Sequence, residues 1–208
     1  MNDYLIGLIT DRSDCLNKIY DEAVKNHIPI VREDMASLLK VIVHMMKPGR
    51  ILEAGTAIGY SSILMAEASS SDCIIDTVEI DPDLVVVARE NIKRANLEER
   101  IHVIAGDMQD VFACLDIKYD MIFLDGAKSR YIDVYDDILR LLKVGGVLLC
   151  DNISYHGKIY DEPKFVDRKH RTIVANLRSF LERLTSDDRF VTSILETGDG
   201  IAISTRIK

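Results

Sequence analysis

The chain has 208 residues, of which 48% are hydrophobic and 29% charged, a balance typical of one globular domain with a sizeable core. Its longest apolar runs, such as 121–124, are far too short to span a bilayer, and the first residues do not resemble a signal peptide. The formal net charge of −8 argues against nonspecific coating of nucleic acid but allows a local basic patch.

The cysteines are scattered and form no C-x-x-C pair; they are Cys15, Cys73, Cys114 and Cys150. Cys73 and Cys150 lie in or beside apolar runs, so we expect buried, reduced thiols rather than disulfides or a zinc site. The sequence therefore predicts a cytoplasmic protein that does not associate with membranes.

Residues 1–47 are predicted to form a helical cap on a sheet. Apolar residues recur at helical spacing, for example Leu16, Ile19 and Ala23. After a break at 27–30, a third helix is predicted from about Asp34 to the Pro48-Gly49 pair.

From residue 50 onward, short apolar runs alternate with amphipathic segments. The predicted strands are 50–53, 73–79, 101–104, 119–124 and 147–150, and the predicted helices are 60–69, 83–95, 108–115 and 132–142. The pair Gly145-Gly146 is expected to be a turn before the fifth strand. This alternation indicates a parallel sheet covered by helices.

The last third of the chain predicts an antiparallel ending. A polar, irregular connection (153–169) leads to a helix at 171–184, and strands at 190–196 and 201–206 are separated by a turn short enough only for a hairpin. We therefore expect a single domain over 1–208 with an α/β, Rossmann-like fold. Its sheet would have seven mostly parallel strands, a C-terminal antiparallel hairpin and helices on both faces.

One stretch, 50–61, has the features of a nucleotide-binding unit. An apolar strand ends at Glu53, a loop with Gly55 and Gly59 follows, and a helix begins at Tyr60. The spacing Glu-x-Gly-x-x-x-Gly lacks the third glycine of a dinucleotide site, which disfavours a nicotinamide-dependent oxidoreductase. A carboxylate at the strand end suits a ligand with positive charge, such as S-adenosylmethionine.

Acidic residues follow five successive strands, where ligands bind in such sheets. They are Glu53, Glu79, Asp107, Asp125 and Asp151. Glu79 comes twenty residues after Gly59, a spacing at which an acidic side chain accepts hydrogen bonds from ribose hydroxyls, and Gly106-Asp107 would lie beside the adenine. Ordinary turn and capping roles remain the alternative for each residue taken singly.

Asp125 and the pair Asp151-Asn152 form a sharper group. If the fourth and fifth strands are neighbours, two carboxylates and an amide oxygen converge, as Mg²⁺ prefers. The alternative is that these residues cap adjacent loops. Lys128 is a candidate base for a hydroxyl or an exposed lysine, and Tyr131 either lines the site or packs.

Together these residues resemble the class I S-adenosylmethionine-dependent methyltransferases, specifically the cation-dependent O-methyltransferases typified by catechol and caffeoyl-CoA O-methyltransferases. The resemblance is carried by 51–61, 123–128 and 149–152. It implies a homodimer with Mg²⁺ or a similar cation on Asp125, Asp151 and Asn152, and Lys128 as the catalytic lysine. It implies a cofactor pocket lined by Val31, Glu53, Gly55, Thr56, Gly59, Tyr60, Ser61, Glu79, Gly106, Asp107, Met108 and Asp125.

Within that family the chain resembles the bacterial tRNA 5-hydroxyuridine methyltransferases, through 27–30, 55–60, 100–102, the basic run in the 153–171 connection and 198–204. It differs by Ala54 in the first motif and by a less basic run at 167–171. The resemblance implies methylation of the wobble 5-hydroxyuridine, whose two adjacent oxygens would chelate Mg²⁺ as a catechol does. The side chains expected to meet the anticodon-loop phosphates are Arg168, Lys169, His170 and Arg171.

Two other functions stay open. A small catechol-type molecule would use the same site, although a chain with no Trp and five Phe offers few side chains for an aromatic slot. A binding module without turnover would bind the cofactor only, and the metal-ligand triad argues against it. The run 168–171 could also be a solvated loop leading into a helix.

Overall fold

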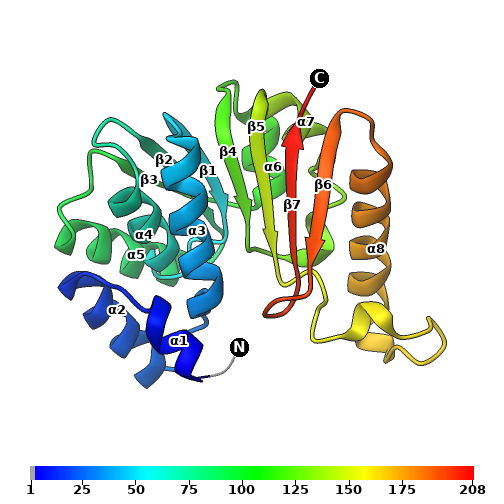
Figure 1. Cartoon of the computed structure of the whole chain (residues 1–208), viewed down its shortest axis with the longest axis horizontal. Helices are drawn as coiled ribbons and strands as arrows, with labels where there is room; N and C mark the ends of the chain where they lie inside the picture. Colours follow the sequence, from blue (N-terminus) through cyan, green and yellow to red (C-terminus); the bar gives the residue numbers. More distant parts are fainter. Residues whose placement is uncertain (1–2) are drawn as a thin grey trace. The chain divides into compact units, whose positions relative to one another are not determined.

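The computed structural model describes residues 3–208 and divides the chain into two compact units, Met1–Asp107 and Met108–Lys208 (Figure 1). The expectation of a single domain over the whole chain stays a prediction.

The first unit begins with three helices, as expected for the N-terminal cap. They are α1 (Asp3–Ile9), α2 (Asp14–Lys25) and α3 (Glu33–Met46). Helix α2 begins where the Ser13 hydroxyl accepts a hydrogen bond from the backbone N–H of Leu16, which caps the helix. Leu16, Ile19 and Ala23 are buried, which confirms the predicted helical spacing.

A parallel sheet completes the first unit. Its strands are β1 (Arg50–Ala54), β2 (Ile74–Glu79) and β3 (Ile101–Ala105), and its helices are α4 (Tyr60–Ala68) and α5 (Pro82–Arg94). Strand β2 pairs in parallel with both β1 and β3. Helix α4 packs against α2, α3 and α5 and is buried along nearly its whole length. The glycine loop therefore leads directly into the core of this unit.

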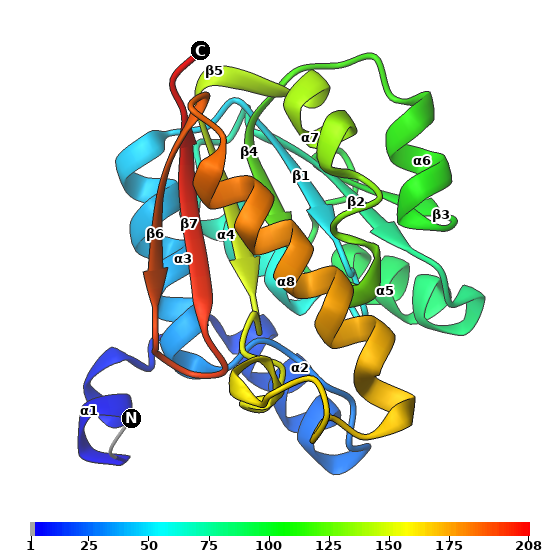
Figure 2. The ribbon, with the colours of Figure 1, turned by 90° about the vertical axis from the view of Figure 1, so that its right-hand side faces the viewer.

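The second unit holds four strands with helices and short 3₁₀ turns between them (Figure 2). Its first half contains α6 (Met108–Cys114), β4 (Tyr119–Leu124), η1 (Lys128–Arg130), α7 (Tyr135–Leu141) and β5 (Leu142–Asp151). Its second half contains η2 (Lys158–Tyr160), η3 (Arg168–His170), α8 (Arg171–Ser186), β6 (Phe190–Leu195) and β7 (Ile201–Arg206). Helix α8 packs against β6 and against all three 3₁₀ turns.

The strand order in the seven-stranded sheet is β3-β2-β1-β4-β5-β7-β6. Strand β4 pairs in parallel with β5, whereas β7 pairs antiparallel with both β5 and β6. This confirms the Rossmann-like fold class with its C-terminal antiparallel hairpin. No helix within residues 3–208 has both the length and the apolar character needed to cross a bilayer. None of the four cysteines, all within the described residues, forms a disulfide, and Cys73 and Cys150 are buried as expected.

The fifth strand differs from the prediction, because the Gly145-Gly146 pair lies inside β5 and does not precede it. Tyr119 pairs with Leu142, whereas Met121 pairs with Val147, so β5 has extra residues that bulge out of register. Gly145 has φ +83°, and a Cβ on Gly146 would lie 2.9 Å from two backbone carbonyl oxygens. These glycines allow the bulge.

We expect Gly146→Ala to destabilise the protein by about 1–3 kcal/mol, because the new methyl group would clash with the Asp120 and Lys143 carbonyls, which cannot rotate away. Urea unfolding measures the free energy. Gly7→Ala is the matched control, since a Cβ there meets nothing within 4 Å. An unfolding free energy for Gly146→Ala equal to that of the wild type would contradict this reading of β5.

Candidate active site

The glycine loop between β1 and α4 is held by backbone hydrogen bonds. The N–H groups of Gly55 and Thr56 both donate to the carbonyl of Val78 on β2, at 3.0 and 3.2 Å. Gly55 and Gly59 have φ of +102° and +83°, a region that glycine enters without steric cost. Gly59 directly precedes α4, so the loop ends at a helix N-terminus with its N–H groups free of intrahelical partners.

Glu53 supports this loop from inside the first unit. Its side chain is fully buried, one residue before the end of β1. Its Oε2 accepts hydrogen bonds from the hydroxyls of Thr77, at 2.6 Å, and Ser62. Because Thr77 donates its only proton to Glu53, the 2.6 Å contact between Thr56 and Thr77 must have Thr56 as donor. Sequence reasoning placed Glu53 correctly at a strand end but missed Ser62 and Thr77.

Glu79, at the end of β2, stabilises the backbone on both sides of it in space. Its Oε2 accepts from the backbone N–H of Ala57, at 2.8 Å, and its Oε1 accepts from that of Asp81, at 3.0 Å. Ala57 has φ +45°, unusual for a residue with a side chain, and the bond to Glu79 stabilises that conformation. The Glu79 carbonyl also accepts from Gly106 N, which brings the ends of β2 and β3 together. A carboxylate has four lone-pair sites, so room remains for ribose hydroxyls.

Tyr60, the first residue of α4, is tied to the N-terminal cap through Arg12. The Arg12 Nε donates to the Tyr60 hydroxyl at 3.0 Å, and the guanidinium lies 3.7 Å from the centre of the Tyr20 ring. Arg12 also forms an ion pair with Glu33 at the start of α3. Burial raises the pKa of Tyr60, and the charge of Arg12 opposes this. No local pattern marks Arg12, which lies 48 residues before Tyr60.

The remaining predicted cofactor residues fall into both units. Val31 and Ser61 are buried, the first just before α3 and the second in the first turn of α4. Asp107 follows β3 at the end of the first unit, and Met108 begins α6 in the second. Whether these side chains line a cofactor pocket stays a prediction.

In the second unit, the pairing of β4 with β5 brings the predicted metal ligands to one edge. Leu124 is in register with Cys150, so Asp125 and Asp151 occupy corresponding positions at the ends of neighbouring strands. This confirms the predicted adjacency of the two strands. Asp151 is buried, and its Oδ1 accepts from the backbone N–H of Asn152 at 2.7 Å. Asn152 has φ +55°.

Asp125 forms an ion pair with Lys128, whose Nζ lies 3.0 Å from its Oδ1. Burial raises the pKa of Asp125, and the ammonium group of Lys128 opposes that rise. Only 17% of the Lys128 side chain is exposed, so the alternative of a freely solvated lysine is wrong.

Tyr131 packs in the interior of the second unit. Its ring meets that of Phe180 edge-on, with the centroids 5.5 Å apart. Its hydroxyl is buried, and no group in residues 3–208 makes a hydrogen bond of ordinary geometry with it. Burial raises the pKa of Tyr131 well above its usual value, and the negative charges of Asp125 and Asp151 raise it further.

This arrangement suits a hard cation. The candidate ligands are the carboxylates of Asp125 and Asp151, in a largely buried environment, and the side-chain amide of Asn152, the residue after Asp151. Mg²⁺ uses oxygen donors of this kind. A bound cation would also relieve the unfavourable burial of the two acids. Residues 3–208 contain no group of three His, Cys, Asp or Glu side chains placed to hold a metal, and the predicted set has only two such members.

The predicted basic run adopts two kinds of role. Arg171 donates from Nε to the Val166 carbonyl, and the His170 Nδ1 lies 2.9 Å from the Tyr155 hydroxyl, so both stabilise their own segment. Arg168 and Lys169 are exposed on the η3 turn, and neither forms an ion pair within the described residues.

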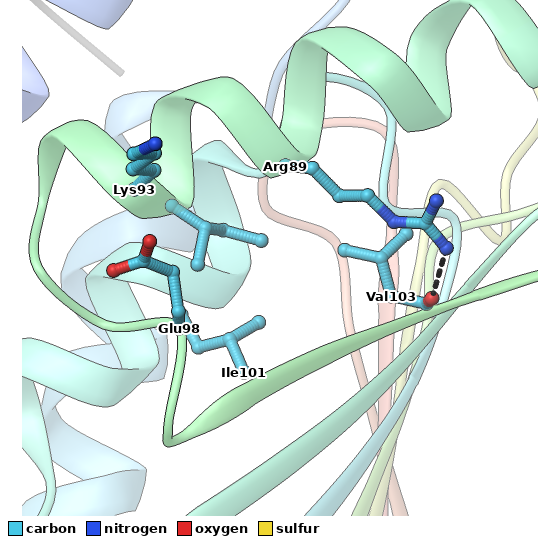
Figure 3. Close-up of a pocket in the computed structure, with 6 residues that line it drawn as sticks. Arg89, Lys93, Glu98, Ile101 and Val103 are labelled. Atoms are coloured by element: carbon cyan, nitrogen blue, oxygen red, sulfur yellow. Dashed lines mark hydrogen bonds between the residues drawn. The ribbon is translucent and has the colours of Figure 1, made fainter.

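The first unit has a groove lined by other residues. It runs between α5 and the edge strand β3, and its apolar lining comes from Ile92, Ile101 and Val103. Figure 3 shows Ile101 and Val103 on the strand side and Arg89 and Lys93 on the helix. Arg89 donates to the Val103 carbonyl at 3.0 Å and so covers part of the sheet edge. None of the predicted site residues lines this groove.

Known proteins resemble this chain along nearly its full length. A family model described as O-methyltransferase matches residues 8–207. A catechol O-methyltransferase from Niastella koreensis is 30% identical over 168 residues, covering 78% of this chain and 76% of the relative. A caffeoyl-CoA O-methyltransferase from Populus kitakamiensis is 27% identical over 183 residues, covering 84% of this chain and 77% of the relative.

Solved structures agree with the sequence relatives. A candidate caffeoyl-CoA O-methyltransferase from Staphylococcus aureus has a TM-score of 0.90, 32% identity and 98% coverage of both chains. An O-methyltransferase from Bacillus cereus, solved in complex with S-adenosylhomocysteine (SAH), has a TM-score of 0.87 and 25% identity. The match covers 98% of this chain and 96% of that one.

We expect Lys128→Met to raise the pKa of Asp125 further, because the ammonium group that opposes the effect of burial is lost. Carboxyl ¹³C chemical shifts followed over a pH titration of the metal-free protein would measure this. Lys143→Met, which breaks an ion pair with Asp120, is the control and should leave the Asp125 pKa unchanged. An unchanged Asp125 pKa in Lys128→Met would show that the ion pair does not form in solution.

Proposed function

This chain belongs to the O-methyltransferase family, and from that premise we propose that it methylates 5-hydroxyuridine at the wobble position of tRNA. In this reaction a methyl group moves from the sulfur of S-adenosylmethionine to the 5-hydroxyl oxygen. The oxygen loses its proton, and the products are 5-methoxyuridine and SAH. The chain's own residues would bind, align and deprotonate the reactants.

S-adenosylmethionine is the cofactor that we propose for the first unit. The support is the glycine loop at a helix N-terminus, and the Bacillus cereus relative that was solved with SAH. Bound there, the cofactor would supply an electrophilic methyl group on a positively charged sulfur. Glu79 would accept from the ribose hydroxyls with its remaining lone pairs, and Glu53 would keep the loop in shape through Thr77 and Ser62.

Mg²⁺ is the cation that we propose for the second unit. Asp125, Asp151 and Asn152 would hold it, and it would stabilise the deprotonated form of the acceptor oxygen. Lys128 is our candidate for taking the hydroxyl proton. A cation held by Asp125 would compete with the ammonium group for that carboxylate, which would free Lys128 from its ion pair.

The support for tRNA as the acceptor comes from the surface of the segment 153–171. In a chain with net charge −8, this segment has five Lys or Arg against three Asp or Glu. Arg168 and Lys169 are exposed and lack ion-pair partners among the described residues. Tyr160 and Phe165 are exposed to 66% and 70%. Cations that can meet phosphates, together with exposed aromatic rings on which bases can stack, are what single-stranded RNA loops require.

The same segment is held in place, so it can present these side chains. Arg178 on α8 donates to the carbonyls of Ile159 and Asp161, on either side of Tyr160. Lys164 lies 4.8 Å from the Phe165 ring centre and pairs with Glu162. The segment also follows Asn152 directly along the chain, which links the proposed metal site to the proposed RNA surface within one unit.

Methylation of a small catechol is the second candidate, favoured by the 30% identity to the Niastella koreensis catechol O-methyltransferase. The same metal ligands would serve both acceptors.

A homodimer, which the family resemblance implies, is part of the main proposal. Light scattering would then give about twice the chain mass of 23.5 kDa.

The deciding assay incubates the protein with labelled S-adenosylmethionine, Mg²⁺ and either tRNA containing 5-hydroxyuridine or catechol. We expect label in tRNA as 5-methoxyuridine, and we expect it to fall by about 100-fold or more with EDTA, which removes the cation, or in Asp151→Ala, which removes a carboxylate ligand. Label in catechol alone would move the acceptor to small molecules. No transfer to either acceptor would overturn both candidates.

The RNA surface has its own test. Arg168→Ala combined with Lys169→Ala should raise the KM for tRNA and lower the slope of log affinity against log salt by about 1.4, since each lost phosphate contact on single-stranded RNA accounts for about 0.7. Phe165→Ala should weaken tRNA binding without changing that slope. Lys143→Ala with Lys208→Ala, two exposed cations that pair with acids, is the matched control. Equal effects of both double variants would argue against this surface.

A further inference from the structure

The chain takes a strained path directly after the proposed metal ligands. Asn152, Tyr155 and His156 have φ of +55°, +49° and +56°. This left-handed region is unfavourable for a bulky residue such as Tyr155, although Asn and His adopt it more readily, so such a run persists where the surroundings support it. The structure therefore needs a specific source of constraint on residues 152–156.

Asp199, in the turn between β6 and β7, is that source. Its Oδ1 accepts two hydrogen bonds, one from the Ser154 hydroxyl and one from the backbone N–H of His156 at 2.7 Å. Its Oδ2 lies 3.7 Å from the His156 Nδ1. A single carboxylate thus holds both neighbours of Tyr155.

The backbone of the turn also binds the strained segment directly. The N–H of Ile153 donates to the Gly200 carbonyl at 3.0 Å, and that of Ser154 donates to the Asp199 carbonyl at 2.8 Å. A Cβ on Gly200, which has φ +80°, would lie 3.0 Å from the Ser154 nitrogen. The turn and the strained segment are therefore docked without space between their backbones.

We propose that Asp199 is a positioning residue that fixes residues 152–156, and through them the amide of Asn152 and the ring of Tyr155. The proposal rests on the proposed function in one respect, that Asn152 is a metal ligand. Asp199 would act only through these residues and would not touch the reacting atoms. Tyr155 passes the constraint on to the basic segment, because its hydroxyl lies 2.9 Å from the His170 Nδ1.

Two substitutions separate the roles of the two carboxylate oxygens. Asp199→Ala removes both hydrogen bonds, whereas Asp199→Asn keeps Oδ1 as an acceptor for both and loses only the charge next to His156. Asp188→Ala is the matched control, since Asp188 pairs with Lys208 at the surface, 2.6 Å away.

The experiment measures hydrogen exchange at the amides of 153–156 and binding of Mn²⁺ by electron paramagnetic resonance, using the full chain with and without SAH. In Asp199→Ala we expect faster exchange at these amides and about tenfold weaker Mn²⁺ binding, the size of effect typical of a group that orients a metal ligand. Asp199→Asn should stay near the wild type, Asp188→Ala should match it, and SAH affinity should be unchanged in all three.

Three results would overturn the proposal. The first is wild-type exchange and Mn²⁺ affinity in Asp199→Ala. The second is faster exchange with no change in Mn²⁺ affinity, including a wild type that binds no Mn²⁺. The third is a parallel loss of SAH affinity and thermal stability, which indicates a general folding role. The expected pattern in a protein that methylates neither tRNA nor catechol would instead support Asp199 and reject the proposed function.

Discussion

Parallel pairing of β4 with β5 is the constraint on which the rest of the site depends. It brings the ends of two strands to one edge, where Asp125 follows β4 and Asp151 is the last residue of β5. Two acids in a largely buried environment are unfavourable unless something compensates them. Lys128 compensates one in part, and a bound cation would compensate both.

Two acidic residues in the first unit form hydrogen bonds that stabilise the glycine loop itself. Glu53 organises hydroxyls around the base of the glycine loop, and Glu79 holds the strained backbone of Ala57. These hydrogen bonds form in the protein alone, so the loop is preorganised and little of the cofactor's binding free energy is needed to shape it. Arg12 extends this network into the N-terminal cap through Tyr60.

In the second unit, a constrained segment is followed directly by an exposed one. Residues 152–156 are constrained by Asp199 and Gly200, whereas the residues beyond them present exposed cations and aromatic rings. A rigid start and an exposed continuation suit a site that fixes the reacting oxygen and selects its acceptor by surface contacts. The family relationship is compatible with either kind of acceptor. The proposed metal ligands and the segment that would select the acceptor are different residues, so the second could differ among relatives that share the first.

Local patterns were sufficient for the order of elements, the glycine loop and the acidic strand ends, because the spacing of apolar and turn residues is a property of neighbours in sequence. The same patterns misplaced Gly145-Gly146, since a glycine pair marks a turn and a bulge equally well, and only the register with β4 distinguishes them.

Tertiary structure alone decided which residues serve the site indirectly. Thr77 lies 24 positions from Glu53, Arg12 lies 48 from Tyr60, and Asp199 lies 45 from Ser154. None of these pairs leaves a periodic signal, because each contact depends on how distant elements pack. The sequence by itself determined the chemistry available at the strand ends, and packing determined how firmly each of those groups is held.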